Sequence, residues 1–156
     1  MKKYFAMLLA VAMVFGLCAF VAPTEAAAAN EIKAGFIFLH DENSTYDLNF
    51  INAVKEACDK LGVEYISKVN IPESEECLDA ALELVDEGCN FIFADSFGHE
   101  PYMIQAAQEF PDVQFCHATG TQAHTAGVKN YHNAFASIYE GRFLGGVAAG
   151  MKLNEM

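Results

Sequence analysis

The sequence is poor in positive charge and contains no tryptophan. Its 156 residues include 9 Lys and Arg against 21 Asp and Glu, which gives a formal net charge of −12. An acidic surface repels phosphate backbones, and no cluster of basic residues interrupts it, so we expect no nucleic-acid partner. Charged residues make up 19% and apolar residues 53%, which favours a folded core over disorder.

The familiar catalytic and metal-binding motifs are also missing. The stretch Ala94-Asp95-Ser96-Phe97-Gly98 lacks the first glycine of a nucleophile elbow, and neither a P-loop nor a GxGxxG turn is present. The 5 histidines fit no HxxxH or HExxH helix pattern, so we expect no metal and no cofactor. An α/β enzyme acting on a small polar substrate, with Asp95, His99 or His117 as acid–base groups, remains the alternative.

The first 29 residues have the features of a secretory signal peptide. Lys2 and Lys3 form a positive start, residues 5–22 are an unbroken apolar run, and residues 26–29 are alanines suited to cleavage. A transmembrane anchor is the competing interpretation, because the apolar run approaches the shortest spanning length. We therefore predict a signal peptide at residues 1–29 and an exported protein, periplasmic or at the cell surface.

Cysteine usage leaves two questions open. Cys18 could carry a lipid anchor, but Leu17 stands where a lipobox needs a small residue, so ordinary cleavage is favoured. An even number of cysteines in an exported chain permits disulfides. Their spacing matches no dense disulfide framework, and their apolar or helical surroundings favour free, buried thiols. The cysteines concerned are Cys58, Cys77, Cys89 and Cys116.

Beyond residue 30, short β-forming runs alternate with helical periodicity. This rhythm is typical of βαβ units, so it predicts an α/β fold with a parallel sheet flanked by helices. Strands are expected at residues 32–39, 63–69, 91–94 and 113–116, with a weaker fifth at 127–131. Helices are expected at 45–61, from Ser74 to about Gly88, at 102–110 and at 137–152.

Polar residues follow three of the expected strands. The loops 40–47, 95–100 and 117–121 would meet at one edge of a parallel sheet, where open α/β folds bind ligands. They carry carboxylates, amides, hydroxyls and aromatic rings, which suit a polar planar ligand. Any one of these residues could equally be a helix cap. As a set they predict a small-molecule site.

Three sequence blocks resemble the basic membrane protein (BMP) family of ABC transporter substrate-binding proteins, which includes purine-nucleoside receptors. They are Ser96-Phe97-Gly98, the stretch EFPDVQFCHATG at 109–120 and the stretch YEGRFLGGVAAG at 139–150. The resemblance runs from about Glu31 to the last residue. It implies a periplasmic-binding-protein type I fold with two lobes that close on a hinge.

The resemblance further implies what this chain contributes. Residues 30–156 would form the N-terminal lobe, with the second lobe absent. The protein would be a non-enzymatic receptor that delivers a nucleoside or purine-like compound to an ABC permease, without forming a stable oligomer. A sensory module on the same fold is an alternative.

The resemblance also suggests ligand contacts. Tyr46 stands where related sequences carry Trp, so Tyr46 and Phe97 are expected to stack on a ring. Hydrogen bonds to the ligand are expected from Asn43, Asp47, Ser96 and Thr119, and His99 is included as a variable position of the second loop. The first loop lacks the family's glycines, which makes it the least typical part of the site.

The last expected helix is rich in small residues. Gly141, Gly145, Gly146 and Gly150 fall within ten positions, although glycine costs about 1 kcal/mol per helix position relative to alanine. We therefore expect this helix to pack closely against another backbone.

Overall fold

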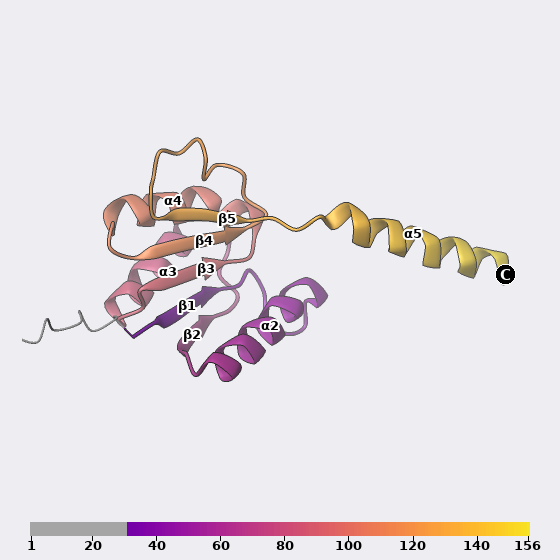
Figure 1. Ribbon diagram of the computed structural model, residues 1–156, viewed down its shortest axis with the longest axis horizontal. Coiled ribbons are helices and arrows are strands. Elements are labelled where there is room, and N and C mark those ends of the chain that lie inside the picture. The colour runs from indigo at the N-terminus through magenta and orange to yellow at the C-terminus, as the bar shows by residue number, and fades with distance from the viewer. Residues whose placement is uncertain (1–30) are drawn as a thin grey trace, which may run out of the picture. The chain divides into compact units, whose positions relative to one another are not determined.

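The structure, a computed structural model, describes residues 31–156 and contains one parallel sheet with the strand order β2-β1-β3-β4-β5 (Figure 1). The strands are β1 (Lys33–Ile37), β2 (Glu64–Lys68), β3 (Phe91–Ala94), β4 (Gln114–Ala118) and β5 (Tyr131–Ala134). The helices are α2 (Thr45–Leu61), α3 (Glu75–Asp86), the short 3₁₀ helix η1 (Phe97–His99), α4 (Glu100–Glu109) and α5 (Ile138–Asn154). The predicted α/β fold is confirmed.

Two predictions concern residues 1–30. The signal peptide at 1–29 and the lipid-anchor alternative at Cys18 lie outside the residues that the structure describes. Within residues 31–156, no helix is both long and apolar enough to cross a bilayer.

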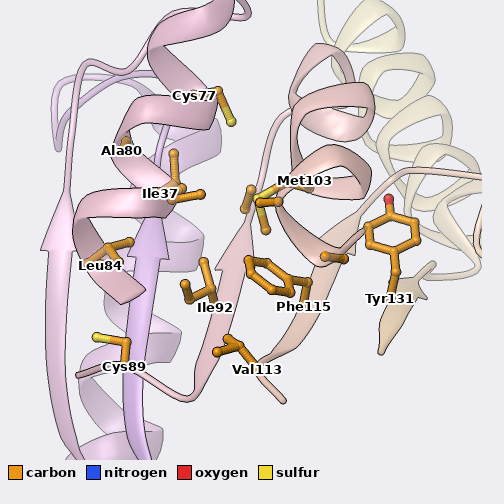
Figure 2. Close-up of a cluster of buried hydrophobic side chains, with 14 residues drawn as sticks. Ile37, Cys77, Ala80, Leu84, Cys89, Ile92, Met103, Val113, Phe115 and Tyr131 are labelled. Carbon is orange, nitrogen blue, oxygen red and sulfur yellow. The ribbon is translucent and has the colours of Figure 1, made fainter. Parts of the chain in front are cut away.

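The two faces of the sheet are covered by different helices. Strand side chains alternate between the two faces. Phe36 of β1 and Phe38, the residue after it, therefore pack on the side of α2, while Ile37 packs on the side of α3 and α4. Figure 2 shows the larger core, in which strand residues such as Ile37 and Phe115 meet Leu84 of α3 and Met103 of α4. Gly35 faces Leu84, and a Cβ there would lie 2.9 Å from Leu84 Cδ1.

Local signals explain why α2 matches its predicted bounds. Ser44 is the N-cap and accepts a hydrogen bond from the Asp47 amide, while Gly62 ends the helix in the left-handed conformation at φ 68°. The helix α3 likewise follows Ser74 and carries Glu75 and Glu76 in its first turn, as predicted, although the Ser74 side chain makes no capping bond.

The structure corrects the predicted fifth strand. Residues 127–130 form a loop, because Gly127 is left-handed at φ 69° and the Asn130 side chain is buried. Asn130 Nδ2 donates to the carbonyls of Ala107 (2.9 Å), Phe110 (2.9 Å) and Val113 (2.8 Å). The strand starts only at Tyr131. The fourth strand, in turn, continues two residues further than predicted, so His117 belongs to it and not to the loop.

The structure also tests the predictions made for the cysteines and for the last helix. The four cysteines of the described chain are free, as favoured from sequence, and Cys116 is partly exposed. Burial raises the pKa of the Cys77 thiol to about 12.

Helix α5 buries none of its residues, and a Cβ on any of its glycines would meet nothing within 4 Å. Its expected backbone partner is therefore not found among residues 31–156.

Candidate functional site

A cavity of about 610 Å³ lies at the carboxyl ends of the strands, where the loops after β1, β4 and β5 meet. Four aromatic rings line it, Arg142 adds a positive charge, and the Thr119 side chain adds a hydroxyl group. The lining residues are Tyr46, Phe50, Phe93, Ala118, Thr119, Ala134, Phe135, Ala136, Ile138 and Arg142. Its position at this edge is where open parallel sheets bind ligands.

A second hollow, of about 460 Å³, lies between α2 and the sheet. Its lining is wholly apolar, with Phe36, Val54 and Phe91 among its residues. It therefore offers no side-chain hydrogen bond to orient a polar ligand, and the cavity at the strand ends is the better candidate.

Tyr46 forms a wall of the strand-end cavity. It is the second residue of α2, and its hydroxyl donates to the Asp95 backbone carbonyl at 3.1 Å. Its ring lies 5.1 Å from the Phe50 ring, which in turn lies 6.0 Å from Phe93. Burial raises the pKa of the phenol, yet 47% of the residue remains exposed. The ring is thus held firmly while part of it stays free for contact.

Thr119 supplies the strained position of the site. Its φ of 65° places a β-branched residue in the left-handed region, which is a true outlier and a common feature of functional sites. The Thr119 amide donates to the Ala134 carbonyl at 3.1 Å, which holds this conformation. Its Oγ1 is buried close to the Tyr46 hydroxyl but makes no hydrogen bond of normal geometry. Thr119 therefore shapes the wall of the cavity next to Tyr46.

Asp47 has a different environment from the one expected of a ligand contact. It is 1% exposed, and its oxygens accept bonds from the His40 amide (2.9 Å), from His40 Nδ1 (3.2 Å) and from the Ser44 hydroxyl. Burial opposes ionisation, but the bonds from Ser44 and His40 outweigh it and lower the pKa of Asp47. Asp47 therefore braces the first turn of α2 against the end of β1.

The loop after β3 is braced by a carboxylate that the sequence did not single out. Glu73 Oε1 accepts the Ser96 hydroxyl at 2.6 Å and the Gly98 amide at 2.7 Å. These two bonds lower the pKa of Glu73. His99 is fully buried with Nε2 2.9 Å from the Ile71 carbonyl, and burial lowers its pKa. Phe97, by contrast, is 66% exposed.

Glu100 holds the long loop between β4 and β5. Its carboxylate accepts the Thr121 and Gln122 amides (2.8 Å each), Gln122 Nε2 (3.1 Å), the Tyr131 hydroxyl (3.1 Å) and Asn133 Nδ2 (3.2 Å). Burial favours the neutral acid, but these donors outweigh it and lower the pKa of Glu100. From the sequence, Glu100 is the last residue of the polar loop 95–100, and nothing in that pattern indicates this role.

The cavity brings together two of the predicted site residues, Tyr46 and Thr119. The other predicted contacts, Asn43, Asp47, Ser96, Phe97 and His99, lie outside its lining as the described chain forms it. Asn43 is exposed and bonds to Asp41 through its amide nitrogens at 2.9 and 3.0 Å. Contact between these five residues and a ligand stays a prediction. Residues 31–156 contain no cluster of His, Cys, Asp and Glu suited to a metal ion.

Comparison with known proteins places this site in context. The chain is 35% identical to a purine-binding protein of Brucella abortus over 127 residues, which cover 78% of this chain and 35% of that protein. It is 33% identical over 99 residues to a Haloferax volcanii protein named as an ABC transporter glucose-binding protein, covering 64% of this chain and 24% of that protein. The chain thus spans about a third of the length of the purine-binding relative and about a quarter of the length of the other relative.

A solved structure supports the fold independently of sequence. An ABC transporter solute-binding protein from Conexibacter woesei superimposes with a TM-score of 0.59 at 13% identity, covering 67% of this chain and 35% of that one. The fold is therefore periplasmic-binding-protein type I-like, as the sequence predicted.

The family model for PnrA-like ABC transporter substrate-binding proteins matches residues 38–156. The family and both relatives are substrate-binding proteins and not enzymes, which confirms the non-enzymatic prediction over the enzyme alternative. The chain belongs to the Bmp family of PnrA-like ABC transporter substrate-binding proteins.

Proposed function

We propose that this chain forms one lobe of an extracytoplasmic receptor that binds a nucleoside or purine-like compound and delivers it to an ABC permease. The observation that carries the proposal is the strand-end cavity, with its aromatic lining, the strained residue Thr119 and the positively charged Arg142. A planar heterocycle has faces for the rings and edge atoms for hydroxyl and guanidinium groups.

Exposed aromatic rings at the same edge of the sheet support a clamp. Tyr46 follows β1, Phe97 follows β3 and Phe135 follows β5, and the last two are 66% and 65% exposed. Large exposed rings are typical of surfaces that bind something. In the proposed receptor these rings would face a ligand held between this lobe and a second one, with hinge closure completing the site.

The purine class is favoured over sugars on two grounds. The Brucella abortus relative is named for purine binding and matches more of this chain than the relative named for glucose. In addition, the carboxylates that could hold sugar hydroxyls are buried or already bonded within the lobe, as Asp47 and Glu100 illustrate. The cavity itself presents rings and few hydrogen-bonding groups.

Isothermal titration calorimetry on the full-length protein tests the ligand class. The panel contains purine nucleosides, free purine bases, pyrimidine nucleosides, glucose and fructose. Heat with a purine compound and none with the sugars supports the proposal. Heat with a sugar alone, or with no purine base or nucleoside, would refute it while leaving the family and fold intact.

Substitutions at Tyr46 test the site. Replacing Tyr46 by Ala should weaken purine binding about tenfold, because stacking on an aromatic side chain contributes about 1–3 kcal/mol per base. Tyr46→Phe keeps the ring and should retain most of the affinity. Leu61→Ala, an exposed position at the other end of α2, is the matched control and should leave binding unchanged.

A further inference from the structure

Two buried carboxyl groups meet at the end of β1. They belong to Asp95 and Asp47, and each accepts a hydrogen bond from one of two consecutive backbone amides. The Leu39 amide donates to Asp95 Oδ1 at 3.2 Å, and the His40 amide donates to Asp47 Oδ1 at 2.9 Å. Asp95 is 0% exposed and Asp47 is 1% exposed. The two side chains lie in hydrogen-bonding contact with each other.

This contact lacks the charge compensation that a buried pair of anions needs. Among residues 31–156, neither carboxylate forms an ion pair with Lys or Arg, and the partner of Asp47 is His40, whose side chain is 58% exposed. While both carboxyls are ionised neither can donate, so Asp95 Oδ2 is left without a partner. Two like charges in contact inside a protein do not both ionise readily, and one proton shared between them removes the conflict.

The environment identifies which group carries the proton. Asp47 has three donors from Ser44 and His40 and lies in the first turn of α2, where the helix dipole favours an anion. Asp95 has a single backbone donor. Burial, followed by the charge of Asp47, raises the pKa of Asp95 to about 7. Asp95 is therefore the protonated partner, and its O–H donates to the Asp47 carboxylate.

We propose that the proton shared by Asp95 and Asp47 acts as a latch that fixes the first turn of α2 to the loop after β3 and so positions Tyr46. Both residues of the latch are connected to Tyr46. Asp47 is its neighbour in α2, and the Asp95 carbonyl accepts the Tyr46 hydroxyl at 3.1 Å. Asp95 is thus a positioning residue. Its effect on a ligand rests on the proposed function, whereas the latch is a property of the free protein.

The latch predicts a pH dependence with a definite sign. Below the pKa of Asp95 the proton joins the two carboxyls, and above it two adjacent anions repel and loosen the first turn of α2. The other titratable groups around the pair are His40, which faces Asp47, the Tyr46 phenol, and His99, which feels the charge of Asp47. Burial raises the pKa of Tyr46 and lowers that of His99, so both shifts move these groups away from pH 7.

Carbon-13 NMR of aspartate carboxyl groups in the full chain tests the latch without any ligand. One carboxyl should titrate near pH 7, about three units above the ordinary value of 3.8. The Tyr46 ring resonances should shift with the same midpoint, and the exposed Tyr139 ring of α5 should not. Asp95→Asn should abolish both transitions, while Asp79→Asn, at an exposed position of α3, should preserve them.

Two results would overturn the proposal: every aspartate titrating below pH 5.5, or a Tyr46 ring that ignores the transition. If Asp95→Asn fails to fold, the wild-type titration decides alone, and Asp47→Asn gives a second check by lowering the Asp95 midpoint at least one unit. A purine panel without heat leaves these spectra unchanged, so failure of the ligand proposal and failure of the latch are distinguishable.

Discussion

The carboxylate of Glu100 provides the sharpest test of how the loop between β4 and β5 is held. Replacing Glu100 by Ala removes the common acceptor of five donors. Thr121 and Gln122 are exposed, so their groups can bond to water instead. The Tyr131 hydroxyl stays buried and loses its acceptor, whereas the half-buried Asn133 Nδ2 keeps its bond to that hydroxyl at 3.1 Å. A buried donor without a partner costs about 1–3 kcal/mol. The same change removes a buried charge, which offsets part of this cost, so we expect a net destabilisation of about 2 kcal/mol.

Urea unfolding, followed by circular dichroism, measures this loss. The matched control is Glu109→Ala on the same helix, where the exposed carboxylate accepts a hydrogen bond from Gln105 Nε2 at 3.3 Å. That change should stay within about 0.5 kcal/mol of wild type. Hydrogen exchange adds a local readout, because the Thr121 and Gln122 amides should lose protection in Glu100→Ala and keep it in the control.

The charge of Glu100 fixes the sign of its pH dependence. Its folded pKa is lowered, so the stabilisation is fully present above the ordinary value of 4.5 and is lost as pH falls through the folded value. The difference between wild type and Glu100→Gln should therefore shrink in acid. Equal stability of the Glu100→Ala and Glu109→Ala proteins at neutral pH would refute the assignment of Glu100 as the loop anchor.

Three further outcomes follow from packing and burial. Gly120→Ala should destabilise by about 2 kcal/mol in urea, since its Cβ would overlap three polar side chains, whereas Gly141→Ala in open space should be neutral or stabilising. Cys116 should react with a thiol reagent well before Cys77, whose burial raises its pKa to about 12; mass spectrometry reports the order, and equal rates would contradict it. The pKa of Asp95 is raised from 3.8 to about 7, so its stabilisation is fully present below pH 3.8 and is lost progressively as pH rises to about 7. Wild type should therefore lose up to about 4 kcal/mol relative to Asp95→Asn between pH 4 and 7, measured by urea unfolding at each pH.

Local chemistry explains which elements could be predicted from the sequence. The bounds of α2 follow from Ser44 and Gly62, two residues whose capping roles depend on their immediate neighbours alone. The strand β3 is a short apolar run between a turn and a polar loop, and it was found at its observed bounds. The fifth strand was displaced because Val128 resembles a strand residue, while the burial of Asn130 depends on carbonyls about twenty residues away.

The site was harder to predict because its polar groups are bonded across the fold. The sequence suggests that Asp47 contacts a ligand, but the hydrogen bonding of Asp47 also involves Asp95. Only the pairing of β1 with β3 brings these two residues close together. Glu73 lies in no motif, yet it braces the Ser96 loop. Tyr46 and Thr119 were predicted together from their strand-end positions, and both line the observed cavity.

The acidic residues near the strand ends change what the site is expected to select. Asp47, Glu73 and Glu100 direct their oxygens to donors within the described chain, and Asp95 accepts the Leu39 amide, so these four acidic residues hold loops in place. The cavity is instead lined by four aromatic rings, by Thr119 and by Arg142. Such a lining favours a neutral or weakly anionic planar compound over a cation, because a cation would find no free carboxylate there. We therefore expect purines with carbonyl edges to bind better than positively charged amines of similar size.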